Sequence, residues 1–183
     1  MEPTELLERT FDEVQRVVDG VQPDQMGAST PCREWDVRAL LNHMTGAVIM
    51  FGNALTDAGA PPEGDVVGDD PSGVFRQASK TTLDAWRQPG ALDRTMQLPM
   101  GEMPGAIAIN INLMDAYVHG LDLAVATGQE DTLDAGLAEM GLSMSKELDL
   151  DRFRMPGVFG PEVQCGESAA PHRRLLAYLG REV

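Results

Sequence analysis

The chain has 183 residues, and 43% of them are hydrophobic, which is enough for one globular domain with a sizeable core. Its 29 acidic residues outnumber its 14 lysines and arginines, and the formal net charge is -15. An acidic surface repels nucleic-acid phosphate and anionic membranes, and the sequence contains no basic run that would offset this. The composition therefore argues against a nucleic-acid or membrane partner.

Cysteine usage and the first residues indicate the compartment. Cys32 and Cys165 are too few and too far apart for a disulfide framework, and no CxxC pair offers a zinc knuckle or a redox site. The first residues are acidic where a signal peptide would be basic, and polar residues interrupt every apolar run before it reaches membrane-spanning length. We expect a cytoplasmic protein.

Hydrophobic periodicity predicts an all-α fold. Apolar residues recur at helical spacing over residues 3–21, 36–58, 74–86, 106–126, 134–148 and 171–179. Glycines and prolines interrupt residues 91–105, which predicts a loop or hairpin between helices three and four. We expect a four-helix bundle with accessory short helices. Residues 1–183 would form a single domain, with an irregular appendage from about residue 150 packing on the bundle.

The predicted helix over residues 106–126 carries the most informative pattern. It is apolar nearly all round, as is typical of a buried central helix, but Asp115, His119 and Asp122 interrupt it. Asp115 and His119 are four residues apart and therefore project from one helix face. Burying both costs several kcal/mol unless something compensates, and a divalent metal ion is one such compensation.

His43 is the natural candidate for a third ligand, because it also lies within an apolar helix face. Three protein ligands would leave a coordination position open, as catalytic sites do. A structural interpretation competes with this one, because a carboxylate and a histidine at this spacing also form simple hydrogen-bonded pairs, and a lone His43 can be a satisfied core residue. The spacing does not show whether His43 meets the other two.

Three further residues receive weaker predictions. Asp122 follows His119 by three residues, which favours a supporting partner that orients His119 over a direct ligand. His172 lies beside Arg173 and Arg174 and is expected to be solvent-exposed at the start of the last helix. Cys32 follows Pro31 in a turn-rich stretch, which favours a small buried or turn residue over a nucleophile.

Several stretches, in order over nearly the whole chain, carry a specific resemblance: TPCREWDVRALLNH at 30–43, MGEMPG at 100–105, DAYVHGLDLA at 115–124, FGPEV at 159–163 and RLLAYLGR at 174–181. With these motifs the chain resembles the mycothiol-dependent, metal-binding branch of the DinB-like superfamily. That branch includes the N-terminal domain of mycothiol-dependent maleylpyruvate isomerase.

The resemblance implies a four-helix bundle whose metal is held by a histidine on the second helix and an acid-x-x-x-histidine pair on a later one. These positions fall on His43, Asp115 and His119. It also implies a low-molecular-weight thiol whose sulfur binds the metal as thiolate. Two departures matter. Asp115 is one methylene shorter than the isomerase's glutamate, and this chain is too short for the isomerase's extra C-terminal domain, so isomerase activity itself is not expected.

Two functional hypotheses follow. In the first, the protein is a metal-dependent S-transferase that adds mycothiol or a similar thiol to a small electrophile, which enters near residues 30–35 and 98–105. Zinc is the first choice of metal, and nickel, iron or manganese are also compatible. In the second, the bundle is a non-catalytic metal-binding protein with a stress or sensing role. Either protein would be a monomer or a homodimer.

Overall fold

The computed structural model describes residues 2–147, 154, 159–166 and 168–182, and it is mostly helical. The described helices and strands, in chain order, are α1 (Pro3–Gly20), α2 (Val37–Thr56), α3 (Pro71–Trp86), β1 (Thr95–Leu98), β2 (Gly101–Pro104), α4 (Gly105–Thr127), α5 (Ala135–Glu147) and α6 (Pro171–Tyr178), with three single 3-10 turns between them. None of the described helices is long and apolar enough to cross a membrane.

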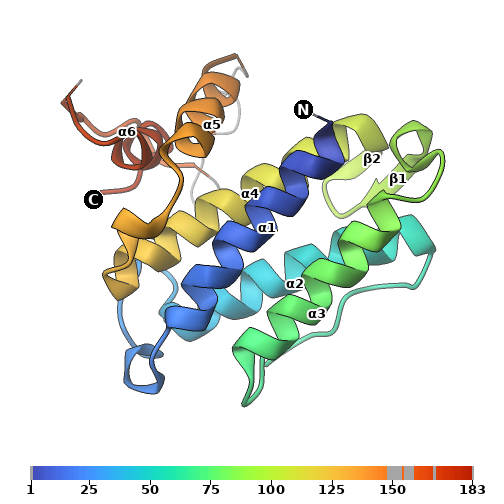
Figure 1. Ribbon diagram of the computed structural model, residues 1–183, viewed down its shortest axis with the longest axis horizontal. Coiled ribbons are helices and arrows are strands. Elements are labelled where there is room, and N and C mark those ends of the chain that lie inside the picture. Colours follow the sequence, from blue (N-terminus) through green and yellow to red (C-terminus); the bar gives the residue numbers. More distant parts are fainter. Residues whose placement is uncertain (1, 148–153, 155–158, 167, 183) are drawn as a thin grey trace.

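Helices α1 to α4 pack together as a bundle. α1 lies against α3 and α4, and α2 lies against the same two helices, so each helix has two neighbours around one core (Figure 1). That core is built from the apolar stripes expected from the sequence, including Phe11 of α1, Leu41 of α2, Phe75 of α3 and Ile109 of α4. The predicted all-α character is confirmed at the level of six helices and one small sheet.

The helix boundaries follow from local capping chemistry. Asp36 begins α2 by accepting a hydrogen bond from the Ala39 amide at 2.8 Å, as its position predicts. α3 begins three residues earlier than the apolar pattern suggests, because Asp70 caps it and Pro71 occupies its first position. Gly128 ends α4 in the left-handed region, with φ of 72°.

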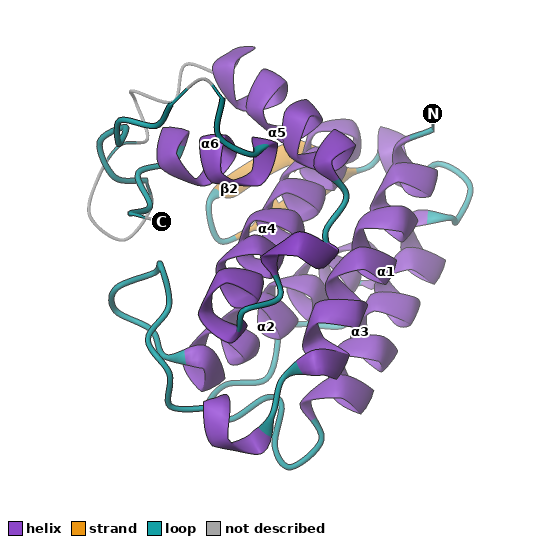
Figure 2. Cartoon of the chain, turned by 60° about the vertical axis from the view of Figure 1, so that its left-hand side comes forward, coloured by secondary structure: helices purple, strands orange, loops and turns teal. Residues whose placement is uncertain are grey.

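The predicted hairpin between the third and fourth long helices is present. β1 and β2 pair in antiparallel register, from Thr95 opposite Pro104 to Leu98 opposite Gly101. Gly101 has φ of 119°, a conformation that side chains rarely tolerate, so the turn depends on glycine here. The hairpin lies against α2 and the start of α4, at one end of the bundle (Figure 1). In the turned view its strands lie partly behind α4 and α5 (Figure 2).

Helices α5 and α6 build a second apolar cluster on the outer side of α4. Tyr117 and Leu121 of α4 contact leucines of both short helices there, including Leu137 and Leu175. Residues 161–166 carry no helix or strand, in line with the irregular stretch that the sequence predicts. Residues 148–153 and 155–158 of the predicted appendage lie outside the described residues, and the assignment of residues 1–183 to one domain stays a prediction.

The expectation that His172 is solvent-exposed is wrong. His172 is the second residue of α6, and it is buried, with 8% of the residue exposed. It precedes Leu175 by three residues and Leu176 by four, and this spacing places it on the same helix face as these two core leucines. The neighbouring arginines suggested exposure, but the helical periodicity decides the face.

Candidate metal centre

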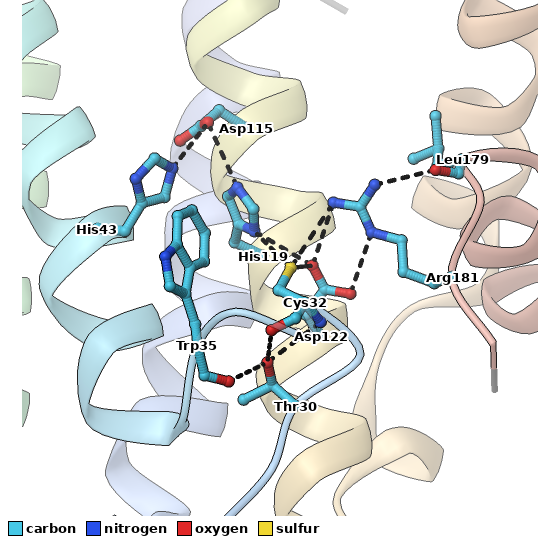
Figure 3. Close-up of polar contacts among 9 residues, drawn as sticks. All are labelled: Thr30, Cys32, Trp35, His43, Asp115, His119, Asp122, Leu179 and Arg181. Atoms are coloured by element: carbon cyan, nitrogen blue, oxygen red, sulfur yellow. Dashed lines mark hydrogen bonds and ion pairs between the residues drawn. The ribbon is translucent and has the colours of Figure 1, made fainter. Parts of the chain in front are cut away.

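His43, Asp115 and His119 meet at the contact between α2 and α4. Asp115 Oδ1 lies 3.8 Å from His43 Nε2 and 3.7 Å from His119 Nε2, and the two imidazole ring centroids are 4.8 Å apart. One donor atom from each residue lies within 4.8 Å of the other two. The packing of α2 on α4 thus brings together the residues that the sequence alone could not join (Figure 3).

The spacing of these donors is close to what a small cation requires. Two ligand atoms about 2.1 Å from a tetrahedral zinc ion are about 3.4 Å apart. The two distances to Asp115 Oδ1, 3.7 and 3.8 Å, exceed this by only a few tenths of an ångström. They are also too long for hydrogen bonds, so neither histidine satisfies this carboxylate directly.

The second oxygen of Asp115 supports the same conclusion. Asp115 Oδ2 is buried and finds no hydrogen-bond partner among the residues that the structure describes. A buried carboxylate oxygen without a partner is costly, and such groups in native proteins usually mark a bound ion or water. Two imidazole nitrogens and a carboxylate form a donor set that suits zinc, nickel, iron or manganese, so these residues fit a divalent cation.

The other nitrogen of His119 faces a buried carboxylate. His119 Nδ1 lies 3.1 Å from Asp122 Oδ2, and Asp122 is completely buried. An ionised carboxylate only accepts hydrogen bonds, so Nδ1 carries the proton and donates it to Asp122. The lone pair of Nε2 then points toward Asp115 and His43. The structure therefore places Asp122 where a partner that orients His119 would lie.

Asp122 has two more partners. The Cys32 thiol donates to its Oδ2 at 3.1 Å, and the Arg181 guanidinium lies 3.4 Å from both carboxylate oxygens. Burial raises the pKa of Asp122, but the hydrogen bond from His119 and the charge of Arg181 outweigh it, so that the net pKa falls below its ordinary value. Asp122 is therefore ionised at neutral pH.

Cys32 is a hydrogen-bond donor at neutral pH rather than a nucleophile. Burial, together with the negative charge of Asp122, raises the pKa of its thiol to about 12. Thr30 holds the loop by accepting from the Cys32 amide at 3.1 Å and donating to the Trp35 carbonyl at 2.8 Å. The sequence predicted a small buried or turn residue, and Cys32 is a partly buried residue of the loop before α2.

Cys32, His119 and Asp122 form a second group whose atoms are close enough for a metal ion. A cation is less needed there, because Arg181 already supplies positive charge to Asp122 and the thiol is protonated. In the first group, the ion-pair partners of Asp115 in the described part of the chain are the two histidines, and no arginine or lysine pairs with it. The cluster of His43, Asp115 and His119 is therefore the better candidate for a metal site.

Two residues of the site escaped the sequence analysis. Arg181 is 8% exposed and lies at the far end of the chain from Cys32, so no local pattern connects it to Asp122. Trp35 stacks on His43, with ring centroids 4.3 Å apart and an angle of 32° between the planes. The position of Trp35 directly before the Asp36 cap predicts that it lies near the start of the helix that carries His43. No sequence pattern predicts that its ring stacks on His43.

A pocket of about 430 Å³ opens directly beside His43 and Asp115. Its other walls come from α2, the loop after α2, the β1–β2 turn and α4: Asn42, Gly46, Ala47, Met50, Phe51, Pro61, Pro62, Gly64, Val66, Pro99, Met100 and Ile111. Part of the expected entrance, at Pro99 and Met100, thus borders the pocket, whereas residues 30–35 do not line it.

Fold and site together define the class of protein: a helical bundle with a candidate divalent-metal centre between two of its central helices. A family model described as the mycothiol maleylpyruvate isomerase N-terminal domain matches residues 7–124, which include His43, Asp115, His119 and Asp122. The chain belongs to this family. The wider assignment to the DinB-like superfamily stays a prediction.

Relatives and solved structures agree with this assignment. Two proteins from two strains of Mycobacterium tuberculosis, the uncharacterized proteins MT0763 and Rv0738, are each 33% identical over 184 residues, covering 100% of both chains. Crystal structures of mycothiol-dependent maleylpyruvate isomerase and of a histidine-to-alanine mutant of it align with TM-scores of 0.55 and 0.57, at 15% and 16% identity. The match covers 66% of this chain and 59% of the isomerase chain, and it shows a shared fold.

Proposed function

We propose that the protein binds one divalent metal ion through His43, Asp115 and His119 and uses it to transfer mycothiol, or a similar thiol, to a small electrophile. The observation that carries the proposal is the convergence of these three side chains, whose ligand atoms lie within 4.8 Å of one another. The buried Asp115 Oδ2, which has no hydrogen-bond partner among the described residues, supports it. Membership in a family named for a mycothiol-dependent enzyme supports the choice of thiol.

The chemistry follows from the donor set. A divalent cation stabilises the thiolate form of a thiol, so that a strong sulfur nucleophile exists at neutral pH. Zinc is the first choice, because its common catalytic sites use three protein ligands and keep one position open. Nickel, iron and manganese remain compatible with the same ligands.

The surrounding residues hold the donors in position. Asp122 accepts a hydrogen bond from the Nδ1–H group of His119 and so fixes the tautomer and the direction of Nε2. Trp35 stacks on His43 and limits the rotation of that ring. Asp115 reaches the same point from α4 with a side chain one methylene shorter than glutamate, and the two helices are close enough for this reach.

The proposed reaction forms one carbon–sulfur bond and breaks one bond of the electrophile. The thiol loses its proton and its sulfur forms a bond to an electrophilic carbon. Either a leaving group departs with the bonding pair, or an alkene carbon takes up a proton after its π bond opens. The electrophile reaches the sulfur from the pocket beside His43 and Asp115. Isomerisation of maleylpyruvate is not proposed, because the likeness covers only 59% of the isomerase chain.

Metal content tests the binding step. We expect about one equivalent of metal per chain in the wild-type protein and a large loss in His43→Ala and His119→Ala. His172→Gln, which alters the third histidine of the chain, is the matched control and should keep its metal. Equal metal content in all four proteins would rule out the site.

Turnover tests the catalytic step. Metal-loaded protein should conjugate mycothiol to a model electrophile such as N-ethylmaleimide faster than the uncatalysed reaction, and the two histidine variants should not. Tight metal binding without any thiol-dependent turnover would instead favour the non-catalytic metal-binding protein with a stress or sensing role.

A further inference from the structure

We propose that the pocket beside the metal centre selects an uncharged, apolar electrophile and rejects a carboxylated one. This inference rests on the proposed function, because it names the class of its second substrate. It concerns the walls of the pocket rather than the metal ligands, and it can be tested without turnover.

Most of the residues that line the pocket are apolar. α2 contributes Met50 and Phe51, the loop after it contributes Pro61 and Pro62, and α4 contributes Ile111. A Cβ atom built on Gly46 would meet nothing within 4 Å, so α2 leaves open space at this point. A volume of about 430 Å³ suits a small molecule.

Ionisable groups occur only at the metal end of the pocket. Among the described lining residues they are His43 and Asp115, and no lysine or arginine borders the pocket. The nearby cation Arg38 is engaged outside it, with the Asp65 carboxylate and with the Gly68 carbonyl at 3.0 Å. With the proposed metal and thiolate in place, the charges of Asp115 and of the sulfur offset the two charges of the cation, so an entering carboxylate meets neither a net positive charge at this end nor a cationic side chain on the walls.

The one polar amide of the lining is already in use. Asn42 donates to the Arg38 carbonyl at 3.1 Å and to Asp65 at 3.2 Å, and its oxygen accepts from the Val67 amide at 3.0 Å. It has little capacity left to replace the water that a carboxylate loses on entry. Burying a charge without such replacement is strongly unfavourable, and the net charge of -15 adds to the repulsion.

Apolar electrophiles meet none of these obstacles. Met50 of α2 and Met100 of the β1–β2 turn both line the pocket with flexible thioether side chains, which adapt to varied apolar shapes. A dicarboxylate such as maleylpyruvate would lack a countercharge on these walls. The pocket therefore fits a small alkyl- or aryl-bearing electrophile whose reactive carbon points toward His43 and Asp115.

A binding experiment tests the selectivity without any reaction. N-ethylsuccinimide is the unreactive, saturated counterpart of N-ethylmaleimide, and succinimidoacetate is its carboxylated analogue. The protein is kept metal-free with a chelator, so that the carboxylate of a probe cannot bind a metal ion. In this protein, labelled with ¹³C at the methionine methyl groups, the neutral probe should shift the Met50 and Met100 signals but not that of Met140, which lies on α5. The carboxylated probe should bind roughly tenfold or more weakly.

Equal affinity for the two probes, or shifts at Met140 without shifts at Met50 and Met100, would overturn the proposal. These results do not depend on the thiol or on turnover. If the neutral probe binds as expected and N-ethylmaleimide is still not conjugated to mycothiol, the selectivity of the pocket stands and the transferase function fails.

A charge at the rim of the pocket should shift its preference. Met100 is 58% exposed in the β1–β2 turn, so Met100→Lys adds a cation there with little risk to folding. It should improve binding of succinimidoacetate relative to N-ethylsuccinimide by roughly tenfold. The matched control is Ile107→Lys, because Ile107 is 53% exposed but does not line the pocket. The same affinity ratio in both variants would contradict the proposal.

Discussion

The two edges of the His119 ring differ in how well the groups around them are satisfied. At the Nδ1 edge, the fully buried Asp122 receives hydrogen bonds from His119, Cys32 and Arg181. At the Nε2 edge, Asp115 lies too far for a hydrogen bond, and its other oxygen has no partner among the described residues. The first edge is complete in the protein itself, whereas the second has acceptor capacity left for a cation (Figure 3).

Removing the Arg181 guanidinium, which pairs with Asp122 at the Nδ1 edge, should have the largest effect on stability. Arg181→Met leaves the Asp122 carboxylate buried without its main positive partner. We expect the free energy of unfolding, measured by urea denaturation, to fall by about 3 kcal/mol. The control is Arg76→Met, which breaks an exposed ion pair with Asp19 and should cost at most about 1 kcal/mol. Similar losses in the two variants would show that the Nδ1 edge does not depend on its buried charge.

Neutralising Asp115, at the Nε2 edge, should lower metal affinity without lowering the stability of the metal-free protein. Asp115→Asn removes a charged ligand. Mutating a residue that only orients a ligand lowers metal affinity by up to roughly 100-fold, so losing the ligand itself should lower it by more than that. The metal-free protein should be as stable as the wild type or more stable, because a neutral amide is less costly to leave buried without a partner than a charged carboxylate. A chelator competition and a urea titration in chelator check the two expectations. A clear loss of metal-free stability would contradict the comparison.

Neutralising Asp122 should instead lower both metal affinity and the stability of the metal-free protein. Asp122→Asn keeps the shape of the side chain but no longer enforces the Nδ1 proton of His119. We expect metal affinity to fall by roughly 10- to 100-fold, and stability of the metal-free protein to fall as well, because Arg181 loses its carboxylate. Asp84→Asn, which alters an exposed pair with Lys80, serves as the control and should change neither quantity.

The last prediction concerns the reactivity of the two cysteines. A thiol with a pKa of about 12 is thiolate in only roughly one molecule in 10,000 at pH 8, so iodoacetamide should label Cys32 very slowly. Cys165 is exposed and should react first. Because the pKa of Cys32 is raised, its labelling should accelerate roughly tenfold per pH unit up to that pKa. Mass spectrometry of Cys165→Ser and Cys32→Ser would measure the two rates, and equal rates at pH 8 would contradict the buried environment of Cys32.

The parts of the structure that the sequence predicts are those set by local rules. Helical periodicity and the Asp36 and Gly128 caps locate α2 and α4, and the spacing of Asp115 and His119 puts them on one face. His43 could be joined to them only by resemblance, because its contact depends on how α2 packs on α4. The proposed ligand roles still await the metal analysis.

The partners of Asp122 had no such local signal. Cys32 lies in a loop before α2, and Arg181 follows α6, so each contact depends on segments that meet only in the folded chain. For His172 a local signal was present but was not used. The charged residues beside it suggested exposure, whereas its spacing from Leu175 places it on the buried face of α6. Long-range ion pairs are therefore the component that periodicity and capping do not predict.

Arg181 also bears on where this protein can be shortened. The family match ends at residue 124, just after Asp122, and Arg181 lies well beyond it. A fragment cut to the matched segment would keep all three proposed ligands but would lose the guanidinium that neutralises the carboxylate behind His119. The family match therefore covers a shorter segment than the one that the charge balance of the site requires. A minimal version of the site needs the residues that follow α6 as well as the bundle.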